Sequence, residues 1–253
     1  MEKFMVPYDL YMTARKRLNE SYPFGEISLL QEFPESDQPP IVSDGAVAKI
    51  TSANKDDIRL AAGVTFLGAN TFSTSGRGNL ICIGRGTTLN HSRIQVNGNG
   101  CVVIIGENCR LKGLKMIVSQ NNSMVFVGSN TTWESGAILS GSGNIVALGN
   151  ECMASSSIVI RTSDGHGIFD RSTGSLINDS ADVMIGHHVW LGNSSRVNKG
   201  ARIGTGTVLG QCAIASGSLD AAALYAGTPA RKLKEGIAWS RTKRYEDIPD
   251  RFR

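Results

Sequence analysis

Residues 185–220 read, in blocks of six, IGHHVW, LGNSSR, VNKGAR, IGTGTV, LGQCAI and ASGSLD. An aliphatic residue or alanine opens every block, and glycine follows four of the six openers. A six-residue period is typical of a β-helix, in which each short side buries one inward aliphatic residue before the chain turns a corner. The stretch therefore predicts an all-β solenoid with three short sides per coil.

The same phase continues toward the N-terminus, where Ile83, Ile105, Val127 and Leu148 are each followed by glycine. Their spacing exceeds three hexads because polar tetrads recur in register. The tetrads are GRGN at 76–79, NGNG at 97–100 and SQNN at 119–122. Glycine and asparagine tolerate positive φ, so the tetrads are predicted to be corner loops. The pattern predicts about seven coils, beginning at residues 61, 83, 105, 127, 148, 185 and 203.

Three regions follow from this pattern: an N-terminal cap or extension at 1–60, the β-helix at 61–225, and a C-terminal segment with a basic tail at 226–253. Within the first region, residues 7–20 are predicted to form an amphipathic helix that opens at a proline. Its apolar face would carry Tyr8, Tyr11, Ala14 and Leu18. The proline-rich stretch 32–44 is predicted to be a linker. We expect the region to cap the first coil or to serve oligomerisation.

Composition limits the class of protein. Five cysteines, an odd number without CxxC spacing, indicate small apolar core residues in a reducing compartment. No stretch approaches 18 consecutive apolar residues, so neither a signal peptide nor a transmembrane span is expected, and the protein is predicted to be cytoplasmic. The net charge of +4 resides in residues 231–253. This tail is either a solvated terminal helix or a site of attraction for a phosphate-bearing ligand, and a nucleic-acid partner is not expected.

The coil that starts at Leu148 carries an insertion, residues 162–182, with the sequence TSDGHGIFDRSTGSLINDSAD. Insertions in solenoids collect on a binding face because they leave the regular wall. His166 stands between Gly165 and Gly167, two residues after Asp164. Imidazole is suited to proton abstraction near neutral pH. We therefore predict that His166 is a catalytic base whose tautomer Asp164 fixes; the alternative is an ordinary surface histidine.

Three motifs together resemble the hexapeptide-repeat acyltransferases: RTSDGHGIFD around His166, VWLGN around Trp190, and AGTPARKL at 226–233. The resemblance is to the branch that O-acetylates bacterial sialic acid and capsular polysaccharides. It implies a left-handed β-helix, a homotrimer with active sites between subunits, acetyl-CoA as donor and a surface glycan as acceptor. His166 is similar to the family's catalytic base, and Trp190 to the aromatic residue that shapes the donor and acceptor sites.

The resemblance also implies residues that bind the donor. They are Trp190, Gly192, Gly210, Gly227, Thr228, Pro229, Ala230, Arg231 and Lys232. The chain departs from the family at 210–217, where GQCAIASG replaces the common GAGSVVTK. No counterpart in the family is identified for residues 1–60.

Other interpretations stay open at this stage. Trp190 could serve subunit packing. His187 and His188 suggest zinc, but neighbours on a strand face opposite ways, so no metal site is expected. The same donor would serve N-acetylation of a nucleotide-linked amino sugar or O-acetylation of serine. A non-catalytic scaffold would retain the hexads without needing His166, Trp190 or the AGTPAR segment.

Overall fold

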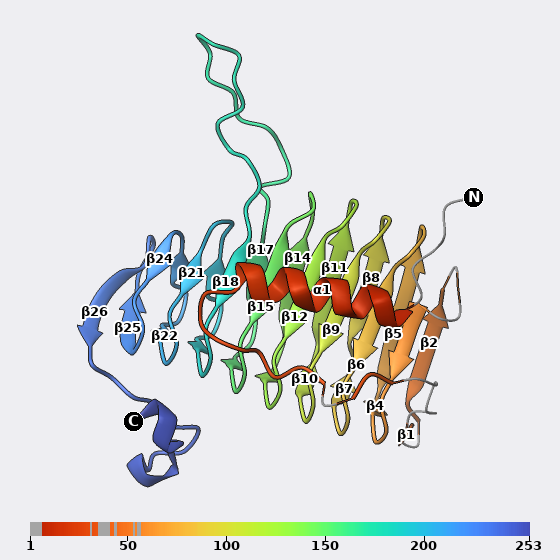
Figure 1. Ribbon diagram of the computed structural model, residues 1–253. Helices are drawn as coiled ribbons and strands as arrows, with labels where there is room; N and C mark the ends of the chain where they lie inside the picture. The colour runs from red at the N-terminus through yellow and green to blue at the C-terminus, as the bar shows by residue number, and fades with distance from the viewer. Residues whose placement is uncertain (1–6, 31, 35–40, 43–44, 53, 55–56) are drawn as a thin grey trace.

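The computed structural model describes residues 7–30, 32–34, 41–42, 45–52, 54 and 57–253. Over these residues the chain forms a β-solenoid of about eight turns with one N-terminal helix (Figure 1). Three sheets run along the solenoid, and each complete turn contributes one strand to each sheet. All strand pairs among these residues are parallel except β25 (Ala223–Ala226) with β26 (Arg231–Glu235). The predicted all-β solenoid is confirmed.

The strands of the described residues fall into the three sheets as follows. Sheet A contains β1 (Ile41–Val42), β4 (Thr65–Leu67), β7 (Thr88–Asn90), β10 (Arg110–Lys112), β13 (Thr132–Trp133), β16 (Met153–Ala154), β19 (Trp190–Leu191), β22 (Val208–Leu209), β25 (Ala223–Ala226) and β26 (Arg231–Glu235). Sheet B contains β2 (Val47–Thr51), β5 (Ala69–Ser75), β8 (Arg93–Asn97), β11 (Leu114–Ser119), β14 (Gly136–Ser140), β17 (Ile158–Arg161), β20 (Arg196–Val197) and β23 (Ile214–Ala215). Sheet C contains β3 (Ile58–Leu60), β6 (Leu80–Ile83), β9 (Val102–Ile105), β12 (Met124–Val127), β15 (Ile145–Leu148), β18 (Val183–Ile185), β21 (Arg202–Ile203) and β24 (Ser218–Leu219).

The register of sheet C follows the phase of the hexads. Ile83 pairs with Ile105, Ile105 with Val127, Val127 with Leu148, and Leu148 with Ile185 across the insertion. These side chains are buried in the core. The polar tetrads lie at the corners, where Gly78 and Asn122, for example, have φ values of 62° and 60°. The predicted corner loops are confirmed, and so is the register from Ile83 onward. The predicted start at residue 61 is wrong by one residue, because Leu60 and not Ala61 pairs with Ile83.

The glycine that follows each opener allows the coils to approach one another. A Cβ on Gly106 would lie 2.6 Å from the backbone nitrogen of Ser129 in the next coil. No side chain fits within that distance, so glycine is required by close contact of two backbones. The opener and the glycine therefore serve one purpose, the stacking of coils.

The solenoid begins earlier than the hexads indicate. β2 pairs with β5 and β1 pairs with β4, so a first turn precedes residue 61 and the number of turns is about eight instead of seven. The strand β2 reads VAKIT, without the aliphatic and glycine pair, and most of its side chains are exposed. Of the predicted linker at 32–44, positions 35–40 and 43–44 lie outside the described residues.

The N-terminal helix α1 (Pro7–Ser21) lies on the outer face of sheet C and runs over several coils (Figure 1). The predicted helix is confirmed, but its position on sheet C differs from the expected cap on the first coil. Its buried residues are Leu10, Tyr11, Ala14 and Leu18, whereas Tyr8 is 52% exposed and was wrongly assigned to this face.

Two kinds of contact hold this region on the solenoid. The Arg17 guanidinium donates to the backbone carbonyls of Asn122 and Gly143 in two corner loops. The Tyr22 hydroxyl, just after the helix, donates to the carbonyl of Ile185 at 2.8 Å. Burial raises the pKa of Tyr22, so its hydroxyl remains a donor. Together these bonds join the N-terminal region to several coils.

The central strands of sheet C are apolar on both faces, which explains why a helix covers them. β6, β9, β12 and β15 read LICI, VVII, MVFV and IVAL, and all sixteen positions are buried. A strand buried on both faces has no polar alternation because neither face meets water. The outward side chains of these strands pack with α1 and the segment after it.

The C-terminal segment also departs from expectation. Instead of a helix, β26 runs antiparallel to β25 at the end of the solenoid, and residues after it form short 3-10 turns at Tyr245–Asp247 and Asp250–Phe252. The Arg241 guanidinium donates to the carbonyls of Asn130, Glu151 and Cys152, at 3.4, 3.2 and 3.0 Å. Part of the basic charge therefore binds corner carbonyls.

Four of the five cysteines are buried as predicted, and Cys212 is exposed. Burial raises the pKa of Cys109 and of Cys152 to about 12 each, which keeps these thiols protonated and unreactive. No helix among the described residues is long and apolar enough to span a membrane.

We predict that Leu18→Ala destabilises the protein by about 2–4 kcal/mol, because it leaves a cavity between α1 and sheet C. Met12→Ala is the matched control on the same helix, since Met12 is 45% exposed, and should change stability by less than about 0.5 kcal/mol. Urea unfolding followed by circular dichroism measures both. Equal effects of the two substitutions would contradict the packing of α1 described above.

Candidate functional site

The insertion forms a long hairpin between β17 and β18 that projects from the solenoid (Figure 1). Its rising arm (162–169) and returning arm (176–182) contain no regular strand and meet at a single bridge between Phe169 and Leu176; hydrogen bonds to Asp170 close the tip. One Asp170 carboxylate oxygen accepts the backbone N–H groups of Ser172 and Thr173, each at 2.8 Å. The hydrogen bond from the Ser172 hydroxyl, followed by these backbone bonds and the one from the Thr173 hydroxyl, lowers the pKa of Asp170 to about 2. These hydrogen bonds fix the turn at the tip of the hairpin.

His166 is exposed in the lower part of the hairpin. The Asn178 side chain, on the returning arm, donates to the His166 carbonyl at 2.8 Å. The Asp164 carboxylate accepts instead from Lys199 Nζ at 2.7 Å and from Asn178 Nδ2 at 3.1 Å, and the hydrogen bond from Lys199 is the first cause of its lowered pKa. Among the described contacts Asp164 has none with the His166 ring, so its predicted effect on the tautomer has no support in a single chain.

Trp190 lies on β19 in sheet A and is 36% exposed, while its neighbour Val189 is fully buried. The predicted outward direction of Trp190 is confirmed. The hairpin, in contrast, leaves the solenoid at the corner between sheets B and C. The structure therefore places His166 and Trp190 on different parts of one chain, and does not bring them together.

The neighbouring histidines have structural partners. His187 Nδ1 accepts the Asn150 N–H at 3.0 Å, and His187 Nε2 donates to the Phe24 carbonyl at 2.9 Å. Both residues lie in the corner between β18 and β19 and not on a strand, and His188 Nε2 bonds the Trp239 carbonyl at 2.9 Å. The two rings have different partners, as predicted, but the reason is a corner with a φ of 50° at His188 and not alternation along a strand. In the described part of the chain, no group of three potential metal ligands is found.

The C-terminal segment completes the surroundings of Trp190, and sequence reasoning missed this. The Trp239 ring is stacked on the His188 ring, with centroids 4.0 Å apart, and lies 5.8 Å from the Trp190 ring. Its indole N–H donates to the His188 carbonyl at 2.8 Å. Phe252 stacks on the same imidazole at 4.4 Å. The sequence signal for this contact was the presence of two large aromatic residues, Trp239 and Phe252, in an otherwise polar tail.

The residues implied in donor binding divide into two groups. Gly192 is buried, and a Cβ there would lie 2.7 Å from the Leu209 carbonyl oxygen, while one on Gly210 would lie 3.1 Å from the Tyr225 carbonyl oxygen. Both glycines thus have a role in coil contact. The second group lies in the turn after β25 and at the start of β26, and is exposed except for Ala230, which packs partly against the core. It comprises Gly227, Thr228, Pro229, Ala230, Arg231 and Lys232.

The positive charge at the start of β26 is partly neutralised by nearby carboxylates. Lys232 Nζ forms ion pairs with Asp220 at 3.1 Å and Glu235 at 3.0 Å. These contacts, that with Glu235 first, raise the pKa of Lys232. The Thr228 hydroxyl donates to the Cys212 carbonyl at 3.3 Å. Arg231 and Lys234 stand exposed on the same strand β26.

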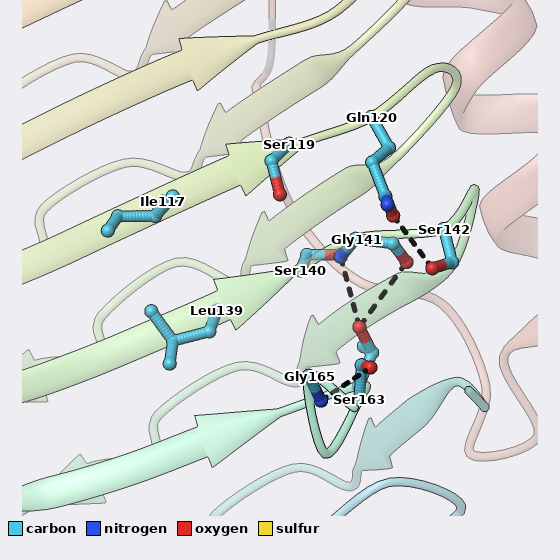
Figure 2. A pocket seen from close by; sticks show the side chains of 10 residues that line it. Ile117, Ser119, Gln120, Leu139, Ser140, Gly141, Ser142, Ser163 and Gly165 are labelled. Atoms are coloured by element: carbon cyan, nitrogen blue, oxygen red, sulfur yellow. Dashed lines mark hydrogen bonds between the residues drawn. The ribbon is translucent and has the colours of Figure 1, made fainter. Parts of the chain in front are cut away.

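A pocket of about 250 Å³ opens at the base of the hairpin, on the edge of sheet B (Figure 2). Its wall combines aliphatic Ile117 and Leu139 with hydroxyl and amide groups from two corner loops and from the rising arm of the hairpin. Figure 2 shows the Ser142 hydroxyl bonded to the Gln120 amide oxygen, at 2.7 Å. The pocket includes Gly165, the residue before His166.

No family model matches the chain. It is 32% identical over 105 residues to a polysialic acid O-acetyltransferase of Escherichia coli O1:K1, a stretch that covers 42% of this chain and 34% of that protein. It is 37% identical over 70 residues to a polysialic acid O-acetyltransferase of Neisseria meningitidis, covering 28% of this chain and 33% of that protein. The matched stretch thus spans about a third of the curated relatives.

A solved structure matches over a greater length. The polysialic acid O-acetyltransferase OatWY has 25% sequence identity and a TM-score of 0.72, covering 79% of this chain and 93% of that chain. The hexads, the stacked coils and this likeness define a hexapeptide-repeat β-helix of the kind found in acetyltransferases. Within that class, the proteins that the chain resembles here are polysialic acid O-acetyltransferases.

We predict that acid destabilises the fold through His187 and His188. Burial lowers the pKa of both, so below the ordinary value of about 6.5 the unfolded chain binds protons that the folded chain does not. Stability should fall as the pH drops from 7 to 5. Melting temperatures of the wild type and of the His187→Gln, His188→Gln double variant measure the effect. The same pH dependence in both proteins would assign the loss to other groups.

Proposed function

We propose that this chain is an O-acetyltransferase that moves the acetyl group of acetyl-CoA to a hydroxyl of a glycan, with polysialic acid as the acceptor. The likeness to OatWY, over 93% of that chain with a TM-score of 0.72, carries the proposal. The curated relatives, both polysialic acid O-acetyltransferases, support the same acceptor. Cytoplasmic residence and a role in capsule modification fit such an activity and belong to the same proposal.

His166 is the proposed general base. It would take the proton of the acceptor hydroxyl as that oxygen attacks the thioester carbonyl. The carbon–sulfur bond then breaks, the acetyl group remains on the acceptor oxygen, and the CoA thiolate leaves and is protonated. Because both substrates are bound together, no covalent intermediate with the protein is needed. Trp190 would supply an aromatic wall for the donor and acceptor.

The pocket at the base of the hairpin supports a glycan acceptor. Hydroxyl and amide groups such as those of Ser119 and Gln120 can exchange hydrogen bonds with sugar hydroxyls, while Ile117 and Leu139 offer an aliphatic surface to a ring face. One wall is formed by Thr162, Ser163 and Gly165, the residues that lead to His166, so a sugar held there would lie next to the proposed base.

The turn from β25 to β26 is the proposed donor site. Its exposed backbone around Gly227 is accessible to the pantetheine arm, and Arg231 and Lys234 would attract the CoA phosphates. Lys232 has two carboxylate partners and would contribute less free charge. Gly192 and Gly210 would shape this surface indirectly, by allowing the coils to approach closely.

The active unit is proposed to be a homotrimer with sites between subunits. Helix α1 covers sheet C, which leaves the outer faces of sheets A and B for neighbours. The hairpin carries exposed apolar side chains, with Phe169 61% and Ile177 63% exposed, that contact with another copy would bury. A hairpin from one subunit would then bring His166 to Trp190 of the next.

We predict that the wild type releases free thiol from acetyl-CoA in the presence of polysialic acid, and that His166→Ala lowers kcat by roughly 100-fold or more. The apparent KM for acetyl-CoA should change little, because the base is not expected to bind the donor. A thiol-reactive dye measures release, with serine, amino sugars and other capsular glycans as comparison acceptors. Preference for an amino sugar or serine would replace the proposed acceptor, and normal turnover of the variant would exclude His166 from the mechanism.

We also predict complementation between two defective variants. His166→Ala and Trp190→Ala should each be nearly inactive alone, whereas their co-expression should restore activity, since some sites in mixed trimers pair a wild-type His166 with a wild-type Trp190. Activity of the purified mixture, with its mass from light scattering, measures this. A mixture no more active than its components would place both residues in one subunit's site.

A further inference from the structure

Lys199, in the corner loop between β20 and β21, contacts the projecting hairpin at Asp164 and Asn178, a part of the hairpin that we call its neck. Lys199 Nζ lies 2.7 Å from a carboxylate oxygen of Asp164 on the rising arm. The same ammonium donates to the Asn178 carbonyl on the returning arm, at 2.6 Å. Lys199 thus binds both arms of the hairpin at once, from a coil beyond the insertion.

Asn178 extends this network to the backbone of His166 and of Ile168. Its Nδ2 donates to the Asp164 carboxylate at 3.1 Å and to the His166 carbonyl at 2.8 Å. Its Oδ1 accepts the Ile168 N–H at 2.6 Å. The Asn178 side chain therefore holds the backbone at His166 and at Ile168, on the two sides of Gly167.

His166 needs such support because its own sequence gives little rigidity. Gly165 has a φ of 87°, and a Cβ there would meet nothing within 4 Å, so no side chain packs the chain in place just before the histidine. Glycine on both sides leaves the backbone with many accessible conformations. Lys199, by contrast, has only 21% of its side chain exposed, and comes from the regular part of the solenoid.

We propose that Lys199 is a positioning residue: with Asp164 and Asn178 it forms a clamp that fixes the hairpin neck and thereby the backbone of His166. The consequence for catalysis rests on the proposed function of His166 as base. In this assignment the Asp164 carboxylate acts on the lysine ammonium and not on the imidazole. The hydrogen bonds from Lys199 and Asn178 also lower the pKa of Asp164, which keeps it ionised in the pair.

Hydrogen exchange tests the clamp without any substrate. Lys199→Met should raise amide exchange across residues 164–178 relative to the wild type, while exchange in β17 and β18 stays the same. Lys199→Arg, which retains charge and donors, should stay close to the wild type. The matched control is Lys112→Met, which removes an exposed pair with Glu134 on another coil. Unchanged exchange of the hairpin in Lys199→Met would overturn the clamp.

Kinetics test its effect on the site. Lys199→Met should lower kcat by about 10-fold or more through misplacement of the base, with the KM for acetyl-CoA unchanged and with recovery in Lys199→Arg. The double variant with Asp164→Asn should be no slower than the slower single variant, because both substitutions open one clamp. If the losses multiply, Asp164 acts separately on His166 and the assignment is wrong. A wild type without acetyl transfer would refute the proposed function, while hydrogen exchange still decides the clamp.

Discussion

Each coil of this protein buries its inward apolar side chains against the coil before it and the coil after it. The ladder of hydrogen bonds that pairs Ile105 with Ile83 on one side and with Val127 on the other therefore also stacks their side chains in the core. Backbones must approach closely for this, which excludes a Cβ at Gly106. The register, the core and the position of every corner loop all depend on this single contact between successive coils.

Because that contact repeats, the sequence predicts it well. The pairings across the insertion, such as Leu148 with Ile185, follow directly from the phase of the aliphatic and glycine pairs. The first turn has no aliphatic and glycine pair in β2 (VAKIT), and most side chains of this strand are exposed. The first turn is therefore recognised only from the pairing of β2 with β5. Continuous apolar runs such as VVII could have predicted that another element covers the outer face of sheet C, because a strand with one face in water alternates apolar and polar residues.

The site is less predictable because it depends on contacts between distant segments. Sequence identified the insertion and His166, and alternation gave the direction of Trp190. It assigned Asp164 to the imidazole because the two residues are close in sequence, whereas the carboxylate binds Lys199 from a later coil. Trp239 reaches the side of Trp190 through an irregular tail that has no period. Local pattern therefore identifies candidate residues but not the contacts that support them.

Helix α1 has a consequence for how the molecule unfolds. A bare solenoid behaves nearly as a one-dimensional chain of repeats, which can fray from either end one repeat at a time. Here one apolar cluster joins the helix region to outward residues from β6 as far as Met184 in β18, and the Tyr22 hydroxyl binds the backbone of that last strand. Opening any of these central coils exposes surface that the same helix shares with the others. The helix therefore converts the middle of the stack into one cooperative unit, and leaves independent fraying to the turns beyond it.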